Sequence, residues 1–185
     1  GYFAISFAFG LFSTSLGLSW AQSLLISMFN LTSAGQLAGV PIIASGGTLI
    51  ELALSQLIIN SRYSLMSVSL SQKFSPRVKL RDKLLIAYAN TDEIFAVAAA
   101  QDCKLVPAYM YGMISVAATG WVGGTLAGSV ANMLLPVSLT AAMGIMLYGM
   151  FIAIVVPPAK NEKEIFLAVV FSVVLSCLFA WFPVL

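Results

Sequence analysis

The chain has 185 residues, of which 60% are hydrophobic and only 9% are charged, and its net charge is +2. A soluble domain carries about 25% charged residues, so this composition excludes an ordinary globular protein. Residues 1–50 and 105–159 contain no charge, and ~20 apolar residues suffice to cross a bilayer. We therefore expect an all-α integral membrane protein that crosses a lipid bilayer several times.

The cysteine and histidine content limits the chemistry. The two cysteines, Cys103 and Cys177, form no metal-ligand spacing, and the chain has no histidine. We expect no enzymatic activity, no metal or other cofactor and no nucleic-acid partner. Because the sequence begins at a glycine and enters an apolar stretch at once, we expect part of a longer protein that lacks its native N-terminus and a C-terminal piece.

The hydropathy pattern predicts about 6–7 hydrophobic segments in one transmembrane transporter domain, residues 1–185. The first two cover residues 1–18 and 20–44. The second contains NLTSAGQLAGVP at residues 30–41, where Gly, Pro and small polar residues disfavour a continuous helix. We favour a broken or re-entrant segment, because such backbone is tolerated at membrane depth only inside protein or beside a water cavity.

A basic loop, QKFSPRVKLRDK at residues 72–83, follows the third segment at residues 47–70. The loop contains five basic residues and one acidic residue, so the positive-inside rule predicts that it is cytoplasmic. The fourth segment, residues 84–101, is interrupted by NTDE at residues 90–93. The remaining segments are expected at residues 106–135, 136–157 and 165–185.

Polar interruptions occur in both the second and the fourth segments, roughly 60 residues apart. Paired interruptions of this kind are a sign of an inverted repeat. The number of spans and the side of the N-terminus stay open, because the first residue lies outside if the first three segments all span and inside if the second is re-entrant. We expect the small residues of GWVGGTLAG, residues 120–128, to form a helix-packing seam.

Four ionisable residues fall within the predicted spans: Glu51, Arg62, Asp92 and Glu93. Placing a charged residue within a span costs about 2.5–3.5 kcal/mol of insertion free energy. Each of the four should therefore pair with an opposite charge or face a cavity. Helical periodicity places Glu51 and Arg62 on one stripe, but eleven residues separate them, about 16 Å at ~1.5 Å per residue. A second stripe of the same helix carries Gln56, Asn60 and Ser67.

Arg62 therefore needs a partner from another segment. Asp92 and Glu93 lie near mid-membrane, and neighbouring helical residues point about 100° apart, so only one can face Arg62 well. We predict an Arg62–Asp92 ion pair, with Thr91 or Tyr88 helping to hold Asp92. The pair could lock two segments together, line a substrate path, or do both.

The break in the second segment offers a further polar cluster, made of Thr32, Ser33, Gly35 and Gln36. One interpretation is close packing of helices through small residues. The other is an unwound segment that binds a small ligand. An amino acid would fit chemically, because helix N-terminal amides suit a carboxylate while carbonyls and a carboxylate suit an ammonium.

Three stretches resemble the AzlC family of branched-chain amino acid permeases. NLTSAGQLAG resembles its small-residue and Gln motif, IINSRYSLMSVSLSQKF (58–74) its Asn-x-Arg-[His/Tyr]-x-Leu-Met signature, and YANTDEIFAVA (88–98) its Thr-Asp-Glu-x-Phe-Ala signature. GWVGGTLAG and LYGMFIAIVVPPAK (147–160) also resemble the family, so the resemblance covers essentially the whole chain in order. Tyr63 stands where many members have histidine, which would remove any histidine-dependent step.

The resemblance implies the large subunit of an exporter of leucine, isoleucine, valine and analogues such as azaleucine, often with a small AzlD-type membrane subunit. It also implies a multi-pass protein of a bacterial inner (plasma) membrane. We expect a central site with Asp92 opposite the residues Thr32, Ser33, Gly35, Gln36, Asn60 and Arg62. The predicted spans hold three acids, Glu51, Asp92 and Glu93, against one base, which motivates coupling to an ion or proton gradient. The alternative is a passive channel for a small polar solute.

Overall fold

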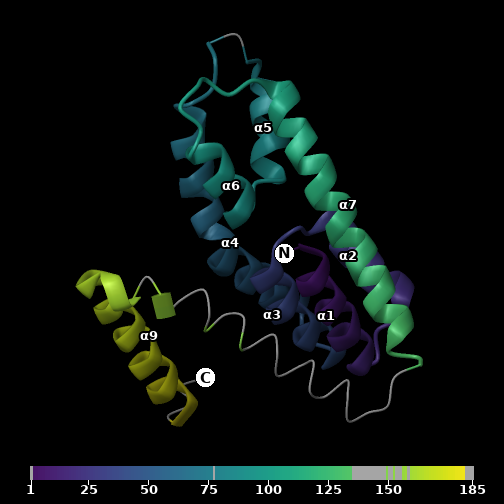
Figure 1. Ribbon diagram of the computed structural model, residues 1–185. Coiled ribbons are helices and arrows are strands. Elements are labelled where there is room, and N and C mark those ends of the chain that lie inside the picture. The colour runs from purple at the N-terminus through teal and green to yellow at the C-terminus, as the bar shows by residue number, and fades with distance from the viewer. Residues whose placement is uncertain are drawn as a thin grey trace. The chain divides into compact units, whose positions relative to one another are not determined.

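The computed structural model describes residues 2–76, 78–134, 149, 152, 156, 157 and 159–181. The chain forms two compact units, Gly1–Thr140 and Ala141–Leu185. Every regular element among the described residues is a helix (Figure 1). The predicted all-α class is therefore confirmed.

The first unit contains seven helices in the part of it that the structure describes. They are α1 Tyr2–Ser15, α2 Trp20–Phe29, α3 Ser33–Ala44, α4 Leu49–Ser71, α5 Leu80–Tyr88, α6 Asp92–Ala99 and α7 Pro107–Ala131. The second unit contains α9, Lys163–Trp181. The segment predicted at residues 136–157 lies mostly outside the described residues.

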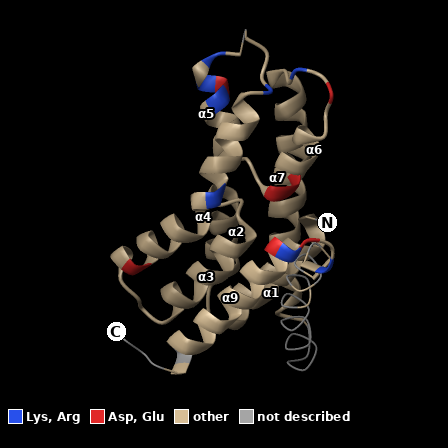
Figure 2. Cartoon of the chain, turned by 90° about the vertical axis from the view of Figure 1, so that its left-hand side faces the viewer, with Lys and Arg blue, Asp and Glu red and all other residues tan. Residues whose placement is uncertain are grey.

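Among the described residues, α7 is the one helix that is both long and apolar enough to cross a membrane by length and composition. α1, α2 and α3 are shorter apolar helices. The predicted count of 6–7 hydrophobic segments and the single domain over 1–185 therefore stay predictions. Figure 2 shows that Lys and Arg gather around the loop before α5, whereas few charges lie along the helices.

The predicted break in the second segment is present. Only residues 30–32 interrupt the helix, and Pro41 lies inside α3 together with both nearby glycines. Close packing against α4 explains the two glycines, since a Cβ at Gly39 would lie 3.1 Å from Gln56 Nε2. The re-entrant course of this segment stays a prediction.

α1 packs along the second half of α7 and runs in the same direction. A Cβ at Gly124 would lie 2.0 Å from Ser6 Oγ, and a Cβ at Gly128 would lie 2.0 Å from Phe7 O. Neither position accepts a side chain without moving a helix. The predicted packing seam at residues 120–128 is therefore confirmed, and α1 ends beside the end of α7.

α4 and α7 run in opposite directions. Leu105 N donates to Lys73 O at 2.9 Å, and Ser75 N donates to Leu105 O at 3.0 Å. These bonds join the loop after α4 to the loop before α7, so the end of α4 lies beside the start of α7. The start of α4 and the end of α7 therefore lie toward the other end of the unit (Figure 1).

α2 and α3 form a first hairpin. α2 begins four residues after α1 ends, and therefore beside the end of α7. In the last third of α7, the Thr125 hydroxyl lies 2.7 Å from the Ser27 hydroxyl of α2. α3 then runs antiparallel to α4, because Gly35 near its start lies against Asn60, and only residues 45–48 separate its end from the start of α4. The chain thus returns to the end from which α2 started.

α5 and α6 form a second hairpin, which starts from the opposite end. α5 begins beside the start of α7, where the Tyr111 hydroxyl donates to Asp82 Oδ1 at 2.9 Å. After a three-residue break, α6 returns, and Lys73 Nζ donates to Ala99 O at its end. The interrupted segment predicted at 84–101 therefore turns back on itself.

Candidate functional site

The candidate site lies where both breaks meet the middle of α4. Arg62 of α4 places Nη2 2.8 Å from Oδ2 of Asp92, the first residue of α6. The predicted ion pair is therefore present. The Arg62 side chain is 47% exposed and that of Asp92 44%, so the pair can be reached from outside the packed helices.

Tyr63 supports the ion pair from its buried position on α4. Arg62 Nη2 donates to the Tyr63 hydroxyl at 2.9 Å, and Arg62 Cζ lies 4.8 Å from the centre of the Tyr63 ring. A cation over an aromatic face gains about 0.5–2 kcal/mol. Tyr63 thus fixes the guanidinium in the position from which it reaches Asp92.

The first break is tied to α4 by a network of side-chain amides. Asn30 and Asn60 both donate to Gln56 Oε1, at 3.2 and 3.1 Å. Gln56 Nε2 in turn donates to Gly35 O at 2.8 Å. A Cβ at Gly35 would lie 2.3 Å from Thr32 Oγ1 and 2.6 Å from Gln56 Oε1, so this close approach requires glycine.

Gln36 closes the end of α2. Its side chain is buried, and its Nε2 donates to Asn30 O at 2.7 Å and to Ser27 Oγ at 3.1 Å. The last carbonyls of a helix have no partner within the helix, and Gln36 supplies one. This contact gives Gln36 a structural role in the turn.

The structure groups the seven predicted substrate-binding residues in two neighbouring places. The first break and the α4 turn beside it hold Thr32, Ser33, Gly35, Gln36 and Asn60, and the second break holds Asp92 with Arg62. The two places lie at the same level of α4, where Asn60 and Arg62 are two residues apart, but these two side chains point about 200° apart round the helix. The Tyr88 hydroxyl also donates to Phe29 O and so joins the two turns directly.

The other predicted acids lie outside the ion pair. Glu51 is exposed in the first turn of α4, where a carboxylate favours the helix N-terminus. Of the two residues expected to support Asp92, Thr91 is the N-cap of α6 and accepts a hydrogen bond from Ile94 N. Tyr88 instead bonds to α2, as described above.

Three buried amide oxygens at the breaks have no hydrogen-bond partner within the described part of the chain. They are Gln36 Oε1, Asn60 Oδ1 and Asn90 Oδ1. Buried polar groups in native proteins are nearly always paired. Acceptors of this kind suit a ligand that donates hydrogen bonds.

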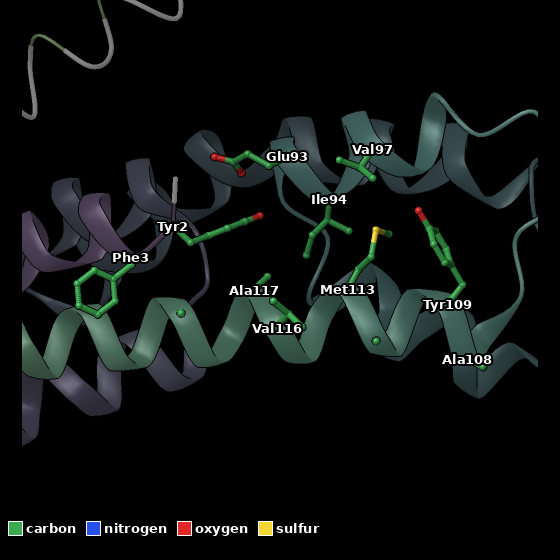
Figure 3. Close-up of a pocket in the computed structure, with 12 residues that line it drawn as sticks. Tyr2, Phe3, Glu93, Ile94, Val97, Ala108, Tyr109, Met113, Val116 and Ala117 are labelled. Atoms are coloured by element: carbon green, nitrogen blue, oxygen red, sulfur yellow. The ribbon is translucent and has the colours of Figure 1, made fainter.

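Glu93 faces a different space from its neighbour Asp92. It lines a cavity of about 780 Å³ between α1, α6 and α7 (Figure 3). The other lining residues are mainly apolar, with the hydroxyls of Tyr2 and Tyr109 as polar exceptions. The Tyr2 hydroxyl shares a hydrogen bond with the Thr91 hydroxyl, so this cavity adjoins the second break.

Sequence reasoning placed the stripe of Gln56, Asn60 and Ser67 on α4 but assigned only one of its members to the site. The structure shows that this stripe receives both breaks: Asn30 donates to Gln56, and Asn90 Nδ2 donates to Ser67 Oγ at 3.3 Å. The signal in the sequence was an asparagine followed closely by a threonine at each interruption.

The family model described as AzlC protein matches residues 1–135 of the chain. The inner membrane protein YgaZ of Escherichia coli (strain K12) is 28% identical over 172 residues, which cover 89% of this chain and 70% of that protein. An uncharacterized membrane protein of Archaeoglobus fulgidus is 26% identical over 165 residues, 87% of this chain and 71% of that protein. No solved structure matches the chain. Because the family model covers more than half of the sequence, the chain belongs to the AzlC family of membrane proteins.

Proposed function

We propose that the chain is a membrane transporter that exports branched-chain amino acids: leucine, isoleucine, valine and analogues such as azaleucine. The observation that carries this proposal is the half-exposed Arg62–Asp92 pair at the meeting point of two broken helices. Charged groups at membrane depth are costly and mark substrate or ion pathways. Transporters typically bind their substrates where discontinuous helices meet.

The groups around the pair match the two ends of a zwitterion. Arg62 suits the carboxylate of an amino acid, and the backbone amides at the start of α3 add donors at a helix N-terminus. Asp92 and the free Asn60 Oδ1 suit the ammonium. In this proposal the substrate exchanges the internal ion pair for two pairs of its own, so neither charge is left without a partner.

The apolar cavity beside the second break supplies a place for a branched side chain. Its volume of about 780 Å³ falls within the range of about 300–1,000 Å³ that is typical of ligand pockets. Ala117 and Val116 contribute apolar wall, and Glu93 lies at the same cavity. Preference for branched over small polar side chains would follow from this lining.

Coupling to a proton or ion gradient and a small AzlD-type membrane subunit complete the proposal. Arg62 balances one of the three carboxylates predicted within the spans, which leaves at least one that could take up a proton during transport. The export direction and the partner subunit rest on the resemblance of the three signature stretches to the family.

The test is the efflux of isoleucine, leucine, valine and methionine from loaded cells, with and without the small subunit. We expect Arg62→Gln to slow leucine efflux by about tenfold or more, equivalent to ~1.4 kcal/mol in the transport barrier. The matched control is Arg81→Gln, which removes an arginine from the exposed pair with Asp82 (3.9 Å) outside the site. Equal efflux from both variants would refute the proposed site, and no efflux from the unmodified protein would refute export.

A further inference from the structure

The two hairpins of the first unit have a shared design but opposite directions. In each, an asparagine at the turn donates its side-chain amide to α4: Asn30 to Gln56, and Asn90 to Ser67. In each, a threonine is the N-cap of the returning helix. α2–α3 starts beside the end of α7 and ends at the start of α4, whereas α5–α6 starts and ends beside the start of α7.

The lengths of the helices show how far each hairpin can reach. At about 1.5 Å per residue, the 23 residues of α4 extend ~34 Å, more than the ~30 Å of a bilayer core. The four hairpin helices have 10, 12, 9 and 8 residues and extend only ~12–18 Å. Each hairpin therefore reaches about the middle of α4 and turns there.

We infer that α2–α3 and α5–α6 are re-entrant hairpins that enter the membrane from opposite faces, and that the contact of their tips is the barrier between those faces. The tips meet directly, because the Tyr88 hydroxyl at the end of α5 donates to Phe29 O at the end of α2. The ion pair and the amide network flank this contact on adjacent turns of α4. Opening of one hairpin would expose the site to one face only.

The inference changes the topology of the chain. The loop at residues 72–79 and the loop at residues 100–106 lie on the same face, since Lys73 bonds to Ala99 O and to Leu105 N. Residues 45–48 and the end of α7 lie on the other face. If the α5–α6 segment crossed the membrane instead, residues 100–106 and the end of α7 would exchange faces.

Native Cys103 offers a probe of this topology, because it is a free, exposed cysteine between α6 and α7. Every variant carries Cys177→Ser, so that each protein has one cysteine. The first keeps native Cys103. The other three carry Cys103→Ser together with Gln72→Cys, Ser45→Cys or Met133→Cys. A membrane-impermeant maleimide is applied to intact cells and to inside-out vesicles. Lys104→Cys with Cys103→Ser replaces the native probe if Cys103 reacts too slowly.

We expect Cys103 to be labelled from the same face as Gln72→Cys, and Met133→Cys from the same face as Ser45→Cys. Labelling of Cys103 from the face of Ser45→Cys, with Met133→Cys on the face of Gln72→Cys, would overturn the inference. The readout needs no transport. The labelling pattern would therefore stay the same even if the protein did not export amino acids. Failure of the topology and failure of the proposed function can thus be told apart.

The barrier role rests on the proposed transport function and needs its own measurement. In a Cys103→Ser/Cys177→Ser background, Phe29→Cys and Tyr88→Cys are combined, and leucine efflux is compared before and after a short bifunctional thiol reagent. We expect the cross-link to abolish efflux, whereas each single cysteine leaves it unchanged by the reagent. Efflux at the original rate with the tips cross-linked would overturn the barrier role.

Discussion

Arg62 Nη2 lies 2.8 Å from Asp92 Oδ2 and joins the middle of α4 to the first residue of α6. Because both side chains are nearly half exposed, the pair contributes only about 1 kcal/mol or less to stability. A purely structural role would therefore be a weak one. The larger consequence of losing either charge should be seen in transport.

Charge exchange separates the two roles. We expect Arg62→Asp and Asp92→Arg, each alone, to lower the melting temperature in detergent slightly and to abolish leucine efflux. The double variant restores an ion pair, so its melting temperature should recover, but it presents the wrong charge to each end of the substrate and should not export. Recovery of export together with stability would show that the pair only holds helices together.

The positions of the charges and the breaks could be predicted from the sequence because both follow local rules. The rise of about 16 Å along the helix excluded Glu51 as a partner of Arg62, and the 100° step between Asp92 and Glu93 left one good candidate. Asn30 at one break, and Asn90 at the other, mark turns because asparagine competes for the backbone. These inferences need only one helix at a time.

The direction of the chain after each break could not be predicted, because it depends on contacts between distant segments. Whether α6 continues or returns is decided by Lys73 and Leu105, which lie far from the break along the chain. The same holds for Gln56, which became part of the site only once Asn30 of the first break was brought to it. Pro41 was misleading as a sign of a break, because it lies inside α3.

The seam between α1 and α7 predicts opposite outcomes for two neighbouring glycines. Gly124→Ala places a Cβ 2.0 Å from Ser6 Oγ and 2.5 Å from Phe3 O, and overpacking of this kind costs about 1–3 kcal/mol. Gly123→Ala meets nothing within 4 Å and should gain about 0.5–1 kcal/mol of helix stability. Thermal unfolding in detergent should show a lowered melting temperature for Gly124→Ala and not for Gly123→Ala.

The cavity between α1, α6 and α7 can be filled without disturbing the helix. Gly112 lines it, and a Cβ there would meet nothing within 4 Å. If the cavity receives the substrate side chain, Gly112→Leu should slow leucine efflux several-fold more than efflux of a smaller amino acid such as alanine. Gly123→Leu is the matched control on the same helix, because that position is also open but lies outside the cavity lining. An equal effect on both substrates would place the side chain elsewhere.

Proton coupling can be assigned by comparing the three acids one at a time. Asp92 is held by Arg62 and Glu51 lies exposed at a helix N-terminus, so Glu93, at the cavity, is the carboxylate most free to exchange a proton with the substrate path. We expect leucine efflux under an imposed pH gradient to lose its pH dependence in Glu93→Gln and to keep it in Glu51→Gln. Asp92→Asn should lower efflux at every pH, because it removes a substrate contact. If all three variants stay as pH-sensitive as the unmodified protein, none of these carboxylates couples transport to protons.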